Sequence, residues 1–391
     1  MRLEELKIGF MPLVDAAPLI VAAEMGFAEE EGLSLVLEAA PSWSALRDRL
    51  CFGQLDAAHM LSPVPVAGAL GLGGGGAKLD ALAVLSVNGN VIGVSRAVAK
   101  RMKDRGHDFG FDDAIAAGKA LIGSMDGPLR VGVPFPFSMH AELVYYWLSA
   151  LGLPAPQNLH VRTVPPPLMA DAIKAGEIDA FCVGEPWGSR SVETGFGELL
   201  LPGTAIWSFA PEKVLAVRSD WASAEQALGA KLIRAVWRAA RWLNPASSRS
   251  LVSELMSRDR FLGVPADLID RALRGRFMIN GSGDGRASEG FVEFFAGAAG
   301  FPWRSQAEWI GTRLAARTGL DRDASVDASR KTFRSDLFRA ALAGVAPDLP
   351  SASVKLEGAI DTPTAVGSLG GRLTLPRDSF FDGRIFEPLD S

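Results

Sequence analysis

The stretch Val161–Trp187, VRTVPPPLMADAIKAGEIDAFCVGEPW, predicts a strand, a turn of three prolines, a helix and a second strand. Residues 165–167 end the first strand and set the start of the helix, because proline has no N–H to give to a sheet. Residues 180–183, AFCV, are apolar on both faces, which is typical of a buried parallel strand. Ligands of open α/β sheets bind outside the carboxyl ends of strands, so Gly184–Trp187 is the first candidate for a site. A plain exit from strand to loop explains the same residues.

Composition bounds the class of protein. The chain has 391 residues, of which 48% are hydrophobic, enough for two compact domains with sheet cores. The net charge is −5 and the Lys and Arg residues are scattered, so direct nucleic-acid binding is not expected. Cys51 and Cys182 lie in apolar contexts without Cys/His metal spacing, and neither a metal nor a cofactor is expected. Residues 71–76 are glycine-rich but lack the Lys-Ser/Thr of a phosphate loop.

The N-terminal residues are used to predict the cellular compartment. Residues 1–7 run straight into a predicted strand, with no apolar signal region and no small-residue cleavage site. No apolar run approaches the length of a membrane span. These features predict a cytoplasmic protein without a membrane span, or a periplasmic one if the start is mis-assigned.

Strands and helices alternate in two sets. Strands are predicted at residues 6–15, 33–38, 55–60, 79–93, 129–133 and 214–217, and helices at 16–31, 45–52, 139–151 and through most of 222–345. Alternation of this kind predicts an α/β fold with parallel-rich sheets and a helical C-terminal return. The long strand is broken at Asn88-Gly89-Asn90, a turn or bulge signal.

Two α/β sets with a late return strand suggest two lobes joined by two crossings, near Val91–Ser95 and Lys213–Val217. We expect residues 1–92 and 216–350 to form the first lobe and residues 93–215 the second. Residues 351–391 are rich in Pro and Gly and form a tail without a predicted structure. A ligand would lie in the cleft between the lobes.

Four polar side chains are candidates for that cleft, each with a commoner alternative. His140 starts a helix, where free N–H groups favour anions, but a helical His is more often satisfied by the backbone. Lys213 lies at a crossing, yet an isolated Lys is usually solvated. Trp43 offers an indole donor or ordinary core packing. Asn90 offers an amide donor or serves as a turn residue.

Acidic residues and histidines give no catalytic motif. Asp15, Asp56 and His59 match no metal spacing; Asp15 is expected to cap a helix and the other two to end a strand. Glu185 is interpreted as a hydrogen-bonding link between the lobes rather than a general base. No nucleophile–base pair is evident, so the chain is not expected to be an enzyme.

Five segments in order resemble the nitrate/bicarbonate-type solute-binding family, the binding components of nitrate and bicarbonate ABC transporters. They are KIGFMPLVDAAPLIVAAEMG, PSWSALRDRL, DAAHMLSPVP, VPPPLMADAIKAGEIDAFCVGEPW and PEKVLAVRSDW. The resemblance implies a two-lobed, periplasmic-binding-protein-like (type II) fold. It also implies nitrate contacts from five residues: Trp43, Asn90, His140, Gly184 through its backbone N–H, and Lys213.

Two departures bear on the ligand. Asn90 stands where the family has a longer glutamine, and the loop PFPFSMH before the helix replaces a small-residue pattern. In bicarbonate-binding relatives the lysine position is acidic and serves calcium, so Lys213 favours nitrate or nitrite. Nitrate carries three acceptor oxygens around one charge, which donors from Trp, His, an amide, a backbone N–H and Lys suit.

The resemblance and the N-terminus together suggest the cytoplasmic nitrate/nitrite sensor branch, which holds an RNA-binding antiterminator protein when ligand-free. The alternatives are the substrate-binding component of a nitrate ABC transporter, and a pyrimidine/thiamin-precursor enzyme or binder on the same fold. The enzyme would require a reactive Cys or His cluster, and Cys51 and Cys182 do not form one.

Overall fold

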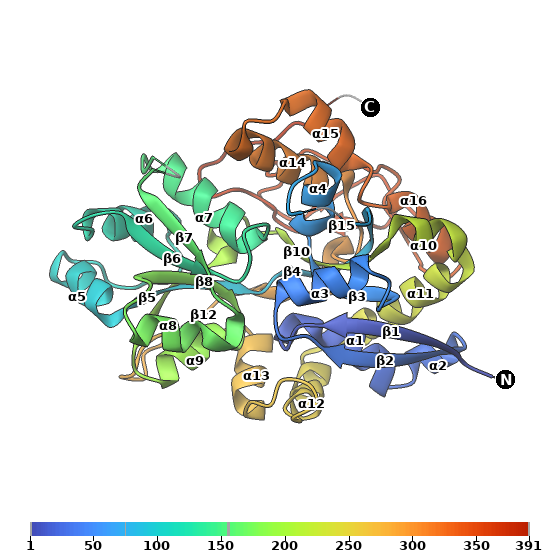
Figure 1. Ribbon diagram of the computed structural model, residues 1–391, viewed down its shortest axis with the longest axis horizontal. Helices are drawn as coiled ribbons and strands as arrows, with labels where there is room; N and C mark the ends of the chain where they lie inside the picture. The colour runs from blue at the N-terminus through green and yellow to red at the C-terminus, as the bar shows by residue number, and fades with distance from the viewer. Residues whose placement is uncertain (1, 75, 155–156, 390–391) are drawn as a thin grey trace.

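The computed structural model describes residues 2–74, 76–154 and 157–389, and arranges their strands in two main sheets (Figure 1). The first has the order β13-β4-β10-β3-β1-β2. Its strands are β1 Glu4–Phe10, β2 Leu33–Ala39, β3 Ala57–Leu61, β4 Leu79–Asn88, β10 Pro211–Arg218 and β13 Val292–Glu293. The second has the order β7-β6-β8-β5-β9. Its strands are β5 Asn90–Ser95, β6 Leu129–Val133, β7 Leu159–Thr163, β8 Ala180–Gly184 and β9 Gly197–Pro202.

Strand pairing confirms an α/β fold with parallel strands in both sheets, although each sheet is mixed. β1 pairs in parallel with β2 and β3, and β6 pairs in parallel with β7 and β8. Each sheet also contains a return strand that is antiparallel to both of its neighbours: β10 lies between β3 and β4, and β5 lies between β8 and β9. Both return strands bring the chain from one sheet to the other.

The predicted break at Asn88-Gly89-Asn90 is the first change of sheet. Asn88 and Gly89 have φ values of 58° and 103°, in the left-handed region that favours Asn and Gly. β4 therefore ends in the first sheet and β5 begins in the second. The chain returns between Pro202 and Pro211. Both changes of sheet lie a few residues before the expected boundaries at 92/93 and 215/216, and the division into lobes stays a proposal.

Two capping serines fix the helices that later carry site residues. The Ser42 hydroxyl accepts the N–H of Ala45 at the start of α3 (Trp43–Cys51), and the Ser138 hydroxyl accepts the N–H of Ala141 at the start of α7 (Met139–Ala150). Such caps satisfy backbone donors that a helix leaves unpaired. The caps place Trp43 and His140 in the first turns of their helices.

Helices cover both sheets. Around the first sheet lie α1 Ala17–Glu24, α2 Phe27–Glu30, α4 Pro63–Ala69, α10 Ser219–Ala224, α11 Gln226–Trp242, α14 Arg304–Thr318, α15 Arg322–Arg330 and α16 Ser335–Leu342. Around the second lie α5 Arg96–Asp104, α6 Ala114–Gly123, α8 Met169–Lys174 and α9 Trp187–Glu193, with α12 Ala246–Met256 and α13 Ala266–Leu273 below in Figure 1. The helix predicted over residues 16–31 is interrupted at Gly26, whose φ is 82°.

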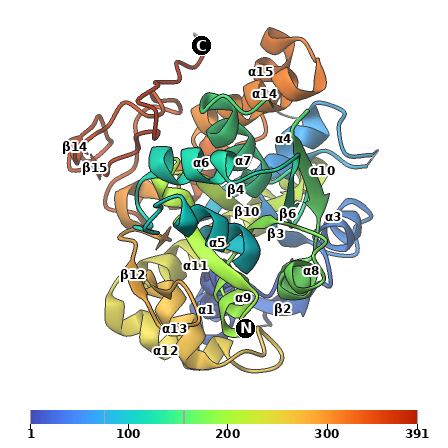
Figure 2. The ribbon, with the colours of Figure 1, turned by 90° about the vertical axis from the view of Figure 1, so that its left-hand side faces the viewer.

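The C-terminal residues, for which the sequence predicted no structure, pack against the rest of the chain. Figure 2 shows them running along one side of the molecule, with the small β14–β15 pair (Thr364–Ala365 and Thr374–Leu375). Phe380 lies against the rings of Trp207 and Trp309, with centroids 4.7 and 5.9 Å away. The Tyr146 hydroxyl donates to Asp382 at 2.7 Å. The tail is thus part of the core that covers α7 and α14.

Within the described ranges no helix is long and apolar enough to cross a membrane.

The tail's packing predicts its contribution to stability. We expect Phe380→Ala to lower the free energy of unfolding by about 3–5 kcal/mol, because it removes a buried ring and leaves a cavity. Leu369→Ala, in the same tail but 68% exposed, should change it by less than about 0.5 kcal/mol. Chemical denaturation measures both. Equal stability of the two variants would show that the tail is not part of the cooperative core.

Candidate functional site

Eight polar or glycine positions meet where the two sheets approach each other. The first sheet and its connections supply Asp15, Trp43, His59, Glu212 and Lys213, and the second supplies Asn90, His140 and Gly184. Every one of the seven side chains is at most 1% exposed. A set of ionisable groups removed from water in this way requires internal partners.

Lys213 forms the centre of this cluster. Its Nζ lies 2.8 Å from Asp15 Oδ2 and 3.0 Å from Glu212 Oε1. Burial by itself would lower the pKa of Lys213, but the two carboxylates raise it above its usual value, so the ammonium is charged. Asp15 also lies 3.0 Å from His59 Nε2. Burial opposes ionisation of Asp15, yet Lys213 and His59 together hold its pKa below the usual range.

Glu212 joins the two sheets. Its Oε2 accepts a hydrogen bond from Asn90 Nδ2 at 2.7 Å, and its Oε1 lies 3.1 Å from His140 Nδ1. Burial raises the pKa of Glu212 to about 7, although Lys213 opposes the rise. Burial, reinforced by the charge of Lys213, lowers the pKa of His140 well below its usual value, so this imidazole is neutral.

Two nitrogen atoms of the cluster face no acceptor. Within the described part of the chain, Trp43 Nε1 and His140 Nε2 are buried and have no hydrogen-bond partner. The Lys213 ammonium lies 5.6 Å from the centroid of the Trp43 ring, which places this donor beside the positive charge. Buried donors left unpaired are costly, and at a candidate site they indicate room for an acceptor.

Gly184 lies close to His140 Nε2. A Cβ atom at this position would be 3.0 Å from Leu13 Cδ2 and 3.8 Å from both His140 Nε2 and Asp15 Oδ2. Any side chain would therefore fill the space in front of the histidine. The strand register pairs Gly184 with Asn90, which keeps both in the same layer of the second sheet.

The structure thus brings all five predicted residues into one cluster, while their contact with a ligand stays a prediction. Asn90 gives its amide N–H to Glu212, so it acts on the site through that carboxylate. Sequence reasoning missed the roles of Glu212, Asp15 and His59. Asp15 was expected to cap a helix, but its side chain makes no capping bond and pairs with Lys213 and His59 instead. Its one available signal was a lone charge in the apolar run FMPLVDAAPLIV.

Glu185 links the two sheets through its main-chain carbonyl and not through its carboxylate. Its buried carboxylate accepts the N–H of Ser189 within its own segment and does not reach the other sheet. The links are made by neighbouring groups: Val14 N donates to the Glu185 carbonyl at 2.9 Å, and Trp187 Nε1 donates to the Pro12 carbonyl at 2.8 Å. Gly184–Trp187 therefore ties the second sheet to the segment that carries Asp15.

The cluster suits binding better than covalent or metal chemistry. Cys182 is the nearest nucleophile, and burial, reinforced by Glu212, raises the pKa of its thiol well above the usual value. Among the residues that the structure describes, no group of three or more His, Cys, Asp or Glu side chains is placed to hold a metal ion. What the cluster offers is a charged ammonium with neighbouring N–H donors.

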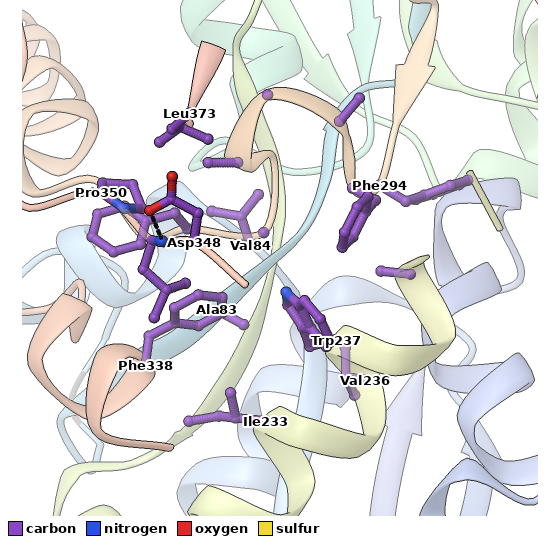
Figure 3. A pocket seen from close by; sticks show the side chains of 18 of the residues that line it. Ala83, Val84, Ile233, Val236, Trp237, Phe294, Phe338, Asp348, Pro350 and Leu373 are labelled. Carbon is purple, nitrogen blue, oxygen red and sulfur yellow. Dashed lines mark hydrogen bonds between the residues drawn. The ribbon is translucent and has the colours of Figure 1, made fainter. Parts of the chain in front are cut away.

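A cavity elsewhere in the molecule has a different character. A cavity of about 200 Å³ lies between α11, β4 and the C-terminal tail, with walls that include Ile233, Trp237 and Phe294 (Figure 3). The Asp348 carboxylate at its edge already accepts three backbone N–H groups of the tail, from Leu349, Gly370 and Arg372. An anion there would face apolar walls, so the polar cluster is the better candidate for an anion.

Comparison with known proteins identifies the family of the chain. The model of the NMT1-like family matches residues 2–257. The chain is 30% identical to the "Nitrate/nitrite binding protein NrtA" of Nostoc sp. strain PCC 7120 over 98% of its length and 82% of the relative. It is 30% identical to the "Nitrate import ATP-binding protein NrtC" of Synechocystis sp. over 95% of its length, but it spans only 56% of that relative.

Solved structures confirm the predicted periplasmic-binding-protein-like fold. The periplasmic nitrate-binding protein NrtA from Synechocystis PCC 6803 superposes with a TM-score of 0.83 and 26% identity, covering 99% of this chain and 96% of that one. A Candida albicans protein described as having the generic periplasmic binding protein fold gives a TM-score of 0.57 at 16% identity, which shows the fold alone. On the extent of these matches, the chain belongs to the NMT1-like family and is similar throughout its length to proteins described as nitrate-binding.

Proposed function

We propose that this protein binds nitrate or nitrite between its two sheets and serves as the substrate-binding component of a nitrate ABC transporter. The observation that carries the proposal is a pair of buried nitrogen atoms, Trp43 Nε1 and His140 Nε2, in the cluster of the charged Lys213. Among the residues that the structure describes, neither nitrogen has a hydrogen-bond partner. The names of the relatives support the choice of ligand, since nitrate and nitrite are what they are said to bind.

The donor set has the chemistry for a small planar anion. Hydrogen bonds to a charged group contribute about 1.5–3 kcal/mol each, and those to an ion are stronger than neutral ones. An indole N–H, an imidazole N–H and an ammonium together satisfy several oxygens of a nitrate ion. Gly184 admits the ligand because it carries no side chain in front of His140.

The transporter interpretation has better support than the cytoplasmic-sensor interpretation. The relatives are described as nitrate/nitrite-binding and nitrate-import proteins, and the solved one is described as periplasmic. Their descriptions mention neither a cytoplasmic sensor nor an antiterminator. The periplasmic alternative that the sequence left open therefore has the better support.

The proposal is limited to binding. Residues 71–76 are glycine-rich but no G-x-x-x-x-G-K-[ST] motif occurs in the sequence, so we do not extend it to the ATP binding named in the NrtC relative, of which the chain spans about half. The enzyme alternative has no support from the cluster, because the thiol of Cys182 is held in its unreactive, protonated form.

A ligand screen tests the proposed class directly. We expect nitrate or nitrite to raise the melting temperature, because a ligand that binds only the native state stabilises it. Bicarbonate, an alkanesulfonate and a thiamin precursor should have no effect at the same concentration. A shift with one of these three and none with nitrate or nitrite would contradict the proposal.

Trp43→Phe isolates one proposed donor. The change removes the indole N–H but keeps an aromatic ring, so we expect nitrate affinity to fall about tenfold to a hundredfold, which corresponds to the loss of one charge-assisted hydrogen bond. Trp207→Phe is the matched control, because its indole Nε1 is also buried without a partner in the described structure, but lies against Trp309 and Phe380. Calorimetry should give near wild-type affinity for the control, and equal losses in both variants would remove Trp43 from the site.

Lys213→Met tests the centre of the cluster. Removing the ammonium leaves Asp15 and Glu212 buried without their partner, so we expect the free energy of unfolding to fall by roughly 3–5 kcal/mol. Nitrate binding should be lost as well. Because instability alone would abolish binding, affinity is measured below the variant's own melting transition. Binding that survives in the folded variant would show that Lys213 is not a ligand contact.

A further inference from the structure

The groups around the proposed anion carry an unusual balance of charge. Glu212 and Lys213 come from β10, Asp15 from the segment after β1, and His59 from β3. The second sheet adds His140 from α7 and Cys182 from β8, of which the imidazole is neutral and the thiol is protonated. Burial lowers the pKa of His59 below its usual value. The positive charge among these groups is therefore that of Lys213, which already lies against two carboxyl groups.

An anion bound here adds a third acidic group to one lysine. If Asp15 and Glu212 were both ionised, the closed site would hold three negative charges and one positive charge out of water. Buried charges without partners are strongly disfavoured, and a buried group takes up a proton instead of remaining charged. Asp15 is the poorer proton acceptor, because Lys213 and His59 both hold it in the ionised form.

The contact between Glu212 and His140 is where the added proton can be held. Glu212 Oε1 lies 3.1 Å from His140 Nδ1, on the far side of the ring from the unpartnered Nε2. With a carboxylate at Glu212 and a neutral ring, the single ring proton is favoured on Nδ1, next to the negative charge. Nε2 is then a bare lone pair, which repels an anion. One more proton on the pair leaves Nε2 as an N–H donor.

We propose that the anion enters this site together with one proton, which the Glu212–His140 pair holds for as long as the anion is bound. This inference rests on the proposed function. The proton comes from solvent on binding and returns to solvent on release, and it resides either on Glu212 with Nε2–H on a neutral ring or on Nδ1 of an imidazolium. Both forms contain the same atoms and the same charge. Glu212 is a positioning residue, since it acts on the ligand through His140.

The pKa of Glu212 in the ligand-free site predicts that nitrate affinity changes with pH near neutrality. Burial raises the pKa of Glu212 to about 7, so above pH 7 the free protein has mostly lost this proton. A neighbouring anion raises the pKa further, so binding recaptures the proton. Nitrate affinity should consequently fall by about tenfold for each pH unit above 7 until the pKa of the complex is reached.

Calorimetry of nitrate binding in buffers of different ionisation enthalpy measures the proton directly. At pH 8, in PIPES, HEPES and Tris adjusted to equal ionic strength with a chloride-matched blank, we expect uptake of about one proton for each nitrate bound. A series from pH 6.5 to 8.5 should show the matching fall in affinity. Zero uptake with constant affinity over this range would overturn the inference.

Two substitutions test whether Glu212 is required for the proton uptake. Glu212→Gln keeps an acceptor for Asn90 but cannot release a proton, so uptake should fall close to zero and the affinity should become independent of pH. Glu185→Gln is the matched control, because burial also raises the pKa of Glu185 to about 7 while its carboxylate contacts Ser189 rather than the cluster. It should keep the full uptake, and uptake that is lost in the control but kept in Glu212→Gln would overturn the assignment.

The outcomes separate this inference from the function on which it rests. Nitrate that binds without proton uptake overturns the inference and leaves the proposed function standing. A wild-type protein that binds neither nitrate nor nitrite at any pH of the series overturns both. If Glu212→Gln does not fold, the wild-type buffer series and the Glu185→Gln control still decide whether a proton accompanies the anion.

Discussion

The buried contact of Lys213 with Asp15 and Glu212 is the interaction on which the arrangement of the site depends. A lone ammonium in this position would lose its charge or stay in water, and two carboxylates remove that cost. Glu212 in turn contacts His140 and Asn90 from the second sheet, at 3.1 and 2.7 Å. The ionic cluster is therefore a principal contact between the two sheets. The hydrogen bonds to the Glu185 carbonyl and from the Trp187 indole hold the same junction.

This cluster also determines which contacts a ligand must make in order to bind. Lys213 is saturated by the protein's own carboxylates, so an incoming anion competes with Asp15 and Glu212 for it. Ligand selection in such a site depends on the difference between two sets of contacts rather than on one charge pair. The unpartnered nitrogens of Trp43 and His140 give the anion contacts that the carboxylates do not use. Protonation of Glu212 would weaken its hold on Lys213 at the moment when the anion arrives.

The sequence predicted the parts of the fold that local signals determine. The serines before α3 and α7, the Asn-Gly break between β4 and β5, and the apolar strand β8 each follow from backbone chemistry that a short window contains. The five site candidates came from motif resemblance, which names residues but not their partners. The roles of Asp15, His59 and Glu212 were missed because they arise from contacts between residues far apart in the chain. Asp15 and His59 are 44 positions apart, and Asp15 and Lys213 are 198 positions apart. The tail was missed for a related reason, since Phe380 and Asp382 are ordered by Trp207, Trp309 and Tyr146 rather than by any periodicity of their own.

The central claim is that an anion occupies the junction of the two sheets. A crystal structure of the protein with nitrate, solved near pH 6.5, tests it most directly. The account predicts nitrate oxygens within hydrogen-bond distance of Trp43 Nε1, His140 Nε2 and Lys213 Nζ, with Glu212 still beside His140. Nitrate bound elsewhere, or a junction in which these three nitrogens contact only protein groups at saturating nitrate, would contradict it.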